Sequence, residues 1–141
     1  MGDASEDDGS VADVLAALDE PTAADSRALI EMMRRISGHE PRLWNVATIG
    51  FDSYHFRYAS GREGDGHCLG FYPRKGKTTI YLMDGTARHA DLLADLGTHT
   101  TSRVCVYVKR LSDVSLPVLE RVLQESYDYL KAQDGSVGRV E

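Results

Sequence analysis

The chain has 141 residues, 42% of them hydrophobic, and its 16 Lys and Arg against 22 Asp and Glu give a formal net charge of −6. A domain of this length buries roughly 68% of the surface that its unfolded chain exposes. The negative balance argues against nucleic acid as a partner, because phosphate backbones attract cationic surfaces. No apolar stretch approaches the roughly 18 residues that suggest a membrane span, and the first residues are acidic where a signal peptide is basic. We therefore expect a cytoplasmic protein that binds neither nucleic acid nor a membrane.

The cysteines indicate the redox compartment of the protein, and the ends of the chain indicate the limits of the domain. Cys68 and Cys105 are too few and too far apart for a disulfide framework, and each lies in an apolar run where a buried thiol fits, so a reducing cytosol suits the chain. Residues 3–8 carry four acids and no large apolar side chain. We expect a disordered acidic tail over residues 1–9, a single domain over 10–132 and a frayed C-terminal tail over 133–141.

The first half of the domain shows the period of amphipathic helices. Apolar residues at positions 11, 14, 15 and 18 have the i, i+3, i+4, i+7 spacing of a short helix, which Pro21 closes. Thr22 and Asp25 have capping-box spacing for a second helix, and Gly38 supplies its C-terminal stop. The sequence therefore predicts a helix hairpin.

After this hairpin the period changes to that of strands. Alternating apolar and polar residues predict strands over residues 49–59, 67–72, 78–83 and 104–109. Short loops at 61–66 and 73–77 make the first three of these strands antiparallel neighbours. Further helices are expected over 88–96, ended by Gly97, and over 116–131. We expect the α+β class, with a mainly antiparallel sheet of about four to five strands packed against the N-terminal helix hairpin and a C-terminal helix.

Aromatic residues on the first expected strand, together with nearby cations, indicate a binding surface. Tyr54 and Tyr58 lie on one face of that strand, and basic residues cluster on and between the strands. Phenol hydroxyls beside fixed positive charge suit a carboxylate or phosphate group, and the hydroxyl-rich loop around His99 can orient an imidazole. We predict a small anionic ligand on the sheet face, bound by Tyr54, Tyr58, Arg74, Lys75, His99 and Lys109.

Plainer explanations exist for the same residues. Aromatics at period two also form the inner face of any sheet under helices, and Lys and Arg at strand edges also prevent edge pairing. A loop such as the one around His99 often only caps and turns. Burial of Tyr54 and Tyr58 beside the cations would distinguish a site from an ordinary core.

The usual signals for catalysis and for a structural metal are missing from the sequence. It contains no Gly-x-Ser-x-Gly elbow, no Cys-x-x-Cys pair and no helical His-x-x-x-His pair. The sequence therefore names no catalytic residue and favours a non-enzymatic protein.

Three motifs carry a resemblance to a known family. They are GFDSYHFRYASGREGD (Gly50 to Asp65), GFYPRKGKTTIYLM (Gly70 to Met83) and GTHTTSRVCVYVKRLSDV (Gly97 to Val114), after a helix ending in MMRRISG. In this order they resemble the YdhG-like domains (domain of unknown function 1801), over most of residues 11–130. The resemblance implies a small α+β unit with an antiparallel sheet, which agrees with the fold expected from periodicity.

The resemblance also implies a second possible function, because one bacterial branch of the family is regarded as a frataxin-like iron chaperone. Labile iron is expected on exposed carboxylates, and the acid-rich N-terminal helices offer Asp13, Asp19, Glu20 and Asp25. The helix dipole and solubility already explain acids near helix starts. The alternative to anion binding is thus iron binding or delivery, and a third class is an interaction module that self-associates through an exposed strand.

The chain departs from the family pattern in the loop before the fourth expected strand. A Gly-Lys pair is typical there, where this chain has Thr101, Ser102 and Arg103, and Thr98 stands where a Lys is usual. The loop is less positively charged as a result, which weakens any anion-binding role implied by the resemblance.

Overall fold

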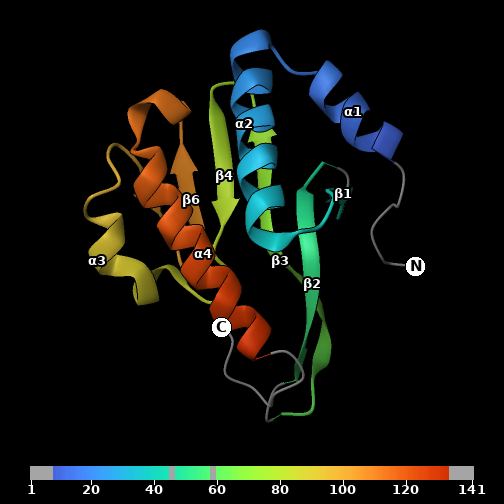
Figure 1. The fold of residues 1–141 in the computed structure, drawn as a ribbon, viewed down its shortest axis with the longest axis vertical. Coiled ribbons are helices and arrows are strands. Elements are labelled where there is room, and N and C mark those ends of the chain that lie inside the picture. The colour runs from blue at the N-terminus through green and yellow to red at the C-terminus, as the bar shows by residue number, and fades with distance from the viewer. Residues whose placement is uncertain (1–7, 45–46, 58–59, 134–141) are drawn as a thin grey trace.

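The computed structural model describes residues 8–44, 47–57 and 60–133. The predicted tails, apart from the residues nearest the domain, lie outside these ranges, as does Tyr58. Helices α2 and α4 lie side by side on one face of a single sheet, with α1 near one edge of the sheet and α3 beside α4 (Figure 1). All strand pairs are antiparallel, so the α+β prediction is confirmed. None of the helices in the described ranges is long and apolar enough to cross a bilayer.

The helices follow the predicted pattern, with one exception at their start. They are α1 (Asp8–Ala16), α2 (Glu20–Ser37), α3 (Ala90–Leu93) and α4 (Leu116–Ala132), with 3-10 turns η1 (Thr86–His89) and η2 (Leu111–Asp113). Asp19 is the N-cap residue of α2, so the expectation that Pro21 ends the first helix and Thr22 caps the second is wrong. Proline is tolerated in a first helical turn because its missing N–H has no partner there anyway.

Within the described residues the sheet has six strands, slightly more than expected. They are β1 (Arg42–Leu43), β2 (Ile49–Arg57), β3 (Glu63–Arg74), β4 (Lys77–Tyr81), β5 (Thr100–Thr101) and β6 (Cys105–Val108), in the order β1-β2-β3-β4-β6-β5. The edge strands β1 and β5 were not predicted, because a two-residue strand shows no period. Gly64 and Gly66, expected in a loop, belong to β3 and pair with Phe56 and Tyr54.

The sheet has one packed face and one outer face. Phe51, Phe71 and Ile80 are fully buried in the core under α2 and α4. Burial of each such side chain stabilises the fold by about 1.5–3 kcal/mol. Alternate residues of a strand point to opposite faces of the sheet. The residues that alternate in sequence with the core residues of β4 and β6 therefore point away from α2 and α4, on the face here called the outer face. On it Thr79 pairs with Tyr72 on one side and with Tyr107 on the other.

Candidate functional site: a basic pocket at the β3–β4 turn

A pocket opens where the β3–β4 turn, the end of β6 and the segment before β5 meet. Its volume is about 400 Å³, within the usual range for small-molecule sites. We call it the turn pocket. It is lined by Gly76, Lys77, Thr98, His99, Thr100, Tyr107, Val108 and Lys109.

The strand register brings these residues together from distant parts of the chain. Gly76, with a φ of 73°, allows the tight turn that starts β4 at Lys77. Thr78 pairs with Val108, so Lys77 and Lys109 stand at the same end of the sheet. Thr100 of the short strand β5 pairs with Tyr107 and closes the pocket on its other side.

Internal contacts hold the polar groups of the turn pocket in place. The Nζ atom of Lys77 lies 4.7 Å from the centre of the Tyr107 ring, and the Tyr107 hydroxyl donates to Oγ of Ser102 at 3.2 Å. Nδ1 of His99 donates to the carbonyl oxygen of Gly97 at 2.7 Å. A carbonyl oxygen only accepts, so this bond fixes the proton on Nδ1 and restrains the ring, and Nε2 of that neutral tautomer is an acceptor rather than a donor.

The turn pocket is positively charged. Lys77 and Lys109 contribute ammonium groups, Thr98 and Thr100 contribute hydroxyl donors, and the described residues that line it include no carboxylate. Such a donor set recognises a negatively charged group by charge-assisted hydrogen bonds. The pocket is therefore suited to an anion although the whole chain is acidic.

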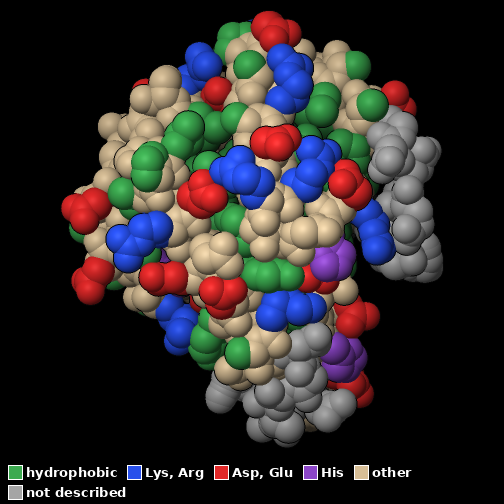
Figure 2. Space-filling view, viewed as in Figure 1, with side chains coloured by type: hydrophobic (Ala, Val, Ile, Leu, Met, Phe, Trp, Pro, Cys, Tyr) green, Lys and Arg blue, Asp and Glu red, His purple; other side chains and the backbone are tan. Residues whose placement is uncertain are grey.

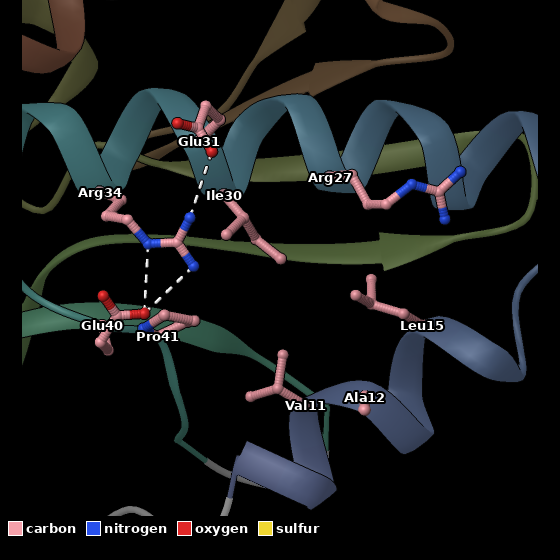
Figure 3. Close-up of a pocket in the computed structure, with 9 residues that line it drawn as sticks. All are labelled: Val11, Ala12, Leu15, Arg27, Ile30, Glu31, Arg34, Glu40 and Pro41. Atoms are coloured by element: carbon pink, nitrogen blue, oxygen red, sulfur yellow. Dashed lines mark hydrogen bonds and ion pairs between the residues drawn. The ribbon is translucent and has the colours of Figure 1, made fainter.

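A second pocket, here called the helix pocket, differs in this respect. It has a volume of about 420 Å³, and Figure 3 shows its apolar floor between α1 and α2. Nη1 of Arg34 lies 3.1 Å from Glu31 and Nη2 lies 3.1 Å from Glu40, while Arg27 pairs with Glu20 at 2.8 Å. Because each of these cations already faces a carboxylate, the helix pocket has little net attraction for an anion. Figure 2 shows the same mixing of charges over the helix-covered side of the molecule.

The structure gathers some of the predicted ligand residues and separates others. His99 and Lys109 line the turn pocket. Arg74, the last residue of β3, and Lys75, in the turn next to Gly76, lie beside it, and both are exposed. The guanidinium carbon of Arg74 lies 5.2 Å from the centre of the Tyr72 ring. Lys77 and Tyr107 were not predicted as ligand residues, although Tyr107 alternates with core valines in the sequence, which places it on the same face as Lys109.

Tyr54 lies elsewhere in the molecule. Its side chain is only 3% exposed and packs with Cys68 and Leu130, on the face covered by α4. The turn pocket lies among β3, β4, β5 and β6, whereas Tyr54 belongs to β2 near the opposite end of the sheet. The structure therefore does not bring Tyr54 to the predicted cations, and the plainer explanation of a packed aromatic fits this residue.

The four carboxylates considered for iron are not gathered either. Asp25 binds Arg110 through contacts of 2.8 and 3.2 Å and also accepts from the backbone N–H of Leu111. A hydrogen bond from Thr22 and the charge of Lys75 help to hold the pKa of Asp19 below its usual value. Glu20 pairs with Arg27, and Asp13 is exposed on α1. Within the described ranges, no cluster of three or more His, Cys, Asp or Glu side chains is placed to hold a metal ion.

A buried network around Asp84 was not foreseen from the sequence. Its fully buried carboxylate accepts from Nε2 of His89 at 2.9 Å and from Oγ of Ser126 at 2.6 Å, with Nε of Arg88 at 3.3 Å. Burial alone would raise the pKa of Asp84, but the bonds from His89 and Ser126 bring it below its usual value. The network joins η1 to α4, and every strong contact is internal, so we assign it a structural role.

A second polar cluster surrounds Asp52, which has a φ of 59° within β2. The Tyr127 hydroxyl donates to its carboxylate at 2.7 Å, and Nζ of Lys131 lies 3.5 Å away. Burial and this carboxylate raise the pKa of Tyr127 well above its usual value. A non-glycine residue in the left-handed region is strained, and these contacts between β2 and α4 keep it there.

His67 forms a third unforeseen feature, on the outer face. Its ring lies between those of Trp44 and Tyr81, with centre-to-centre distances of 5.5 and 5.3 Å. It covers Gly70, where an added Cβ would lie 2.8 Å from the imidazole. Burial lowers the pKa of His67 to about 4, so the ring is neutral at pH 7.

Comparisons with known proteins add nothing to this geometry. No family model, no curated protein and no solved structure matches the chain. The resemblance to YdhG-like domains therefore stays a prediction.

Proposed function

We propose that the protein binds a small anionic ligand in the turn pocket. The supporting observation is the convergence of Lys77 and Lys109, next to His99, in one hollow whose described lining residues include no carboxylate. The hydroxyls of Thr98 and Thr100 add neutral donors around the same space, whereas the Tyr107 hydroxyl donates its proton to Ser102. Hydrogen bonds to charged groups contribute about 1.5–3 kcal/mol each, which is enough for specific binding when several act together.

The size of the expected effect follows from the two lysines. Both are exposed, so the lower end of that range applies, and the loss of each ammonium raises the dissociation constant about tenfold. Removing both raises it about 100-fold. Neither side chain belongs to the core, so the melting temperature stays nearly unchanged.

Isothermal titration with inorganic pyrophosphate tests this proposal. The test variant is Lys77→Ala with Lys109→Ala, and the matched control is Arg27→Ala with Arg121→Ala, which removes the same charge from exposed positions on α2 and α4. We expect the test variant to lose binding and the control to keep it. Equal losses in both would show that pyrophosphate responds only to net charge, and the proposal would be wrong.

The same titration with ferrous ion addresses the alternative of iron binding. No observation favours that alternative, since Arg110 and Arg27 already pair with Asp25 and Glu20. Ferrous binding that disappears when Asp13, Asp19, Glu20 and Asp25 are neutralised together would support it.

Two further points concern the cellular location of the protein and its self-association. We propose that it acts in the cytoplasm as a non-enzymatic binding protein, because its two cysteines, Cys68 and Cys105, are not joined in a disulfide, which is typical of reducing compartments. Self-association through a strand edge stays an alternative, because β1 pairs with only Ile49 and Gly50 and covers a small part of the nine-residue strand β2.

A further inference from the structure

We infer that the ligand of the turn pocket is an anionic group carried on a planar ring, and that the ring lies against Tyr107. This inference rests on the proposed function and deepens it by naming the ligand class. Aromatic acids and nucleotides share this chemistry, since each joins a flat ring to a carboxylate or phosphate. Three features of the pocket support it: its size, its tyrosine wall and the position of Lys77.

The size of the turn pocket exceeds that of a simple inorganic anion. A water molecule occupies roughly 30 Å³ of liquid, so a volume of about 400 Å³ holds about a dozen waters. Inorganic phosphate has five heavy atoms and fills only a fraction of this space. The remaining volume suits a ligand with an additional body the size of one or two rings.

The wall that this body would meet is flat and fixed. The Tyr107 ring is half-buried, and its hydroxyl bond to Ser102 restrains the ring orientation. Gly76, which also lines the pocket, has no side chain to take up its space. A restrained aromatic ring stacks with another planar ring without a large loss of side-chain entropy.

The position of Lys77 lets it take part in recognising both the anionic group and the planar ring of the ligand. Its ammonium group lies 4.7 Å from the centre of the Tyr107 ring, in a cation–π contact. Such a contact is weak at an exposed site, and a charge-assisted hydrogen bond to a phosphate or carboxylate is stronger. An incoming anion therefore draws Lys77 off the ring, and the ring face that is freed receives the planar part of the same ligand.

Matched pairs of compounds test the inference by isothermal titration. Each pair shares its anionic group and differs in the ring: phenyl phosphate against inorganic phosphate, benzoate against acetate, and adenosine 5′-monophosphate against ribose 5-phosphate. We expect the ring-bearing member of at least one pair to bind about tenfold more tightly. The pair with the largest ratio distinguishes a nucleotide from a simpler aromatic acid.

Two tyrosine variants show whether the preference arises at Tyr107. Tyr107→Ala should reduce the ratio within each pair to about one while leaving the affinity for the ring-free member nearly unchanged. Tyr72→Ala is the matched control, because Tyr72 lies on the same outer face, pairs with the same Thr79 and carries its own cation, Arg74, but does not line the pocket. Tyr107→Leu replaces Tyr107→Ala if the latter fails to fold, as judged by circular dichroism.

The possible failures separate this inference from the proposed function. If no compound binds the intact protein, the proposed function fails and the inference fails with it. If ring-free and ring-bearing anions bind equally, or if Tyr107→Ala keeps the preference for rings, the inference is overturned. In that case the proposed function still stands, provided that Lys77→Ala with Lys109→Ala loses binding.

Discussion

The sharpest consequence of the structure concerns His67 and acid stability. Its imidazole is packed between Trp44 and Tyr81, and burial lowers its pKa from 6.5 to about 4. The unfolded chain takes up the proton near pH 6.5, whereas the folded protein takes it up only near pH 4. Between these values the unfolded state binds more protons, so the free energy of unfolding falls as the pH falls. At 1.36 kcal/mol per pH unit, acidification across this window removes about 3 kcal/mol.

Urea unfolding at intervals between pH 7 and pH 4 measures this loss, with circular dichroism and the fluorescence of Trp44 as probes. His67→Phe keeps a ring in the stack and removes the titrating nitrogen. We expect the intact protein to lose about 3 kcal/mol more than the variant over the window. Equal pH dependence in both proteins would refute the burial argument.

The other groups with altered pKa values that titrate near this window do not obscure the measurement. Hydrogen bonds that His55 donates to Glu63 and Asp65 raise its pKa, so His55 is charged in both states through most of the window and its contribution is lost only as the pH rises. The pKa values of Asp52 and Asp84 are lowered from 3.8, so the stability from these carboxylates is lost only as the pH falls below that value.

Three further predictions test other parts of the structure. Gly97→Ala should lower the free energy of unfolding by about 2–4 kcal/mol, since φ is 119° and the new Cβ would lie 2.5 Å from a backbone oxygen. Gly61→Ala, with a φ of 99° and open space, should lower it by only about 1 kcal/mol in the same urea assay. Asp84→Ala should lower the free energy of unfolding by about 3–5 kcal/mol, because it leaves the buried donors of His89 and Ser126 without an acceptor. Tyr127→Phe should cost about 1.5–3 kcal/mol and raise the pKa of Asp52, which titration by NMR measures. Unchanged stability in Gly97→Ala, Asp84→Ala or Tyr127→Phe would contradict the contact concerned.

Much of the fold follows from the period of the apolar residues. The last helix, expected over 116–131, is observed as Leu116–Ala132, because its apolar stripe and its cap at Ser115 are local features. The strands β2, β3, β4 and β6 were predicted for the same reason. The edge strands were not, since their backbone pairing is decided by neighbours far along the chain rather than by their own two residues.

The site was less predictable because it depends on register. Alternation places Lys109 and Tyr107 on one face, but only the pairing of β4 with β6 shows that Lys77 stands beside them. The aromatic residues at alternate positions of β2 suggested Tyr54 as a ligand residue, whereas its side chain packs under α4. The bond between Asp84 and Ser126 joins residues 42 positions apart, and no local pattern announces such a contact.

The most direct test of the central claim is to locate the bound anion by amide NMR. Titration of the labelled protein with pyrophosphate should shift the resonances of Gly76, Lys77, Thr98, His99, Thr100 and Lys109 most strongly. The shifts should saturate together, with one dissociation constant. If the largest shifts fall instead on Arg27, Glu31 and Arg34 in the helix pocket, or spread evenly over all basic residues, the turn pocket is not the anion site.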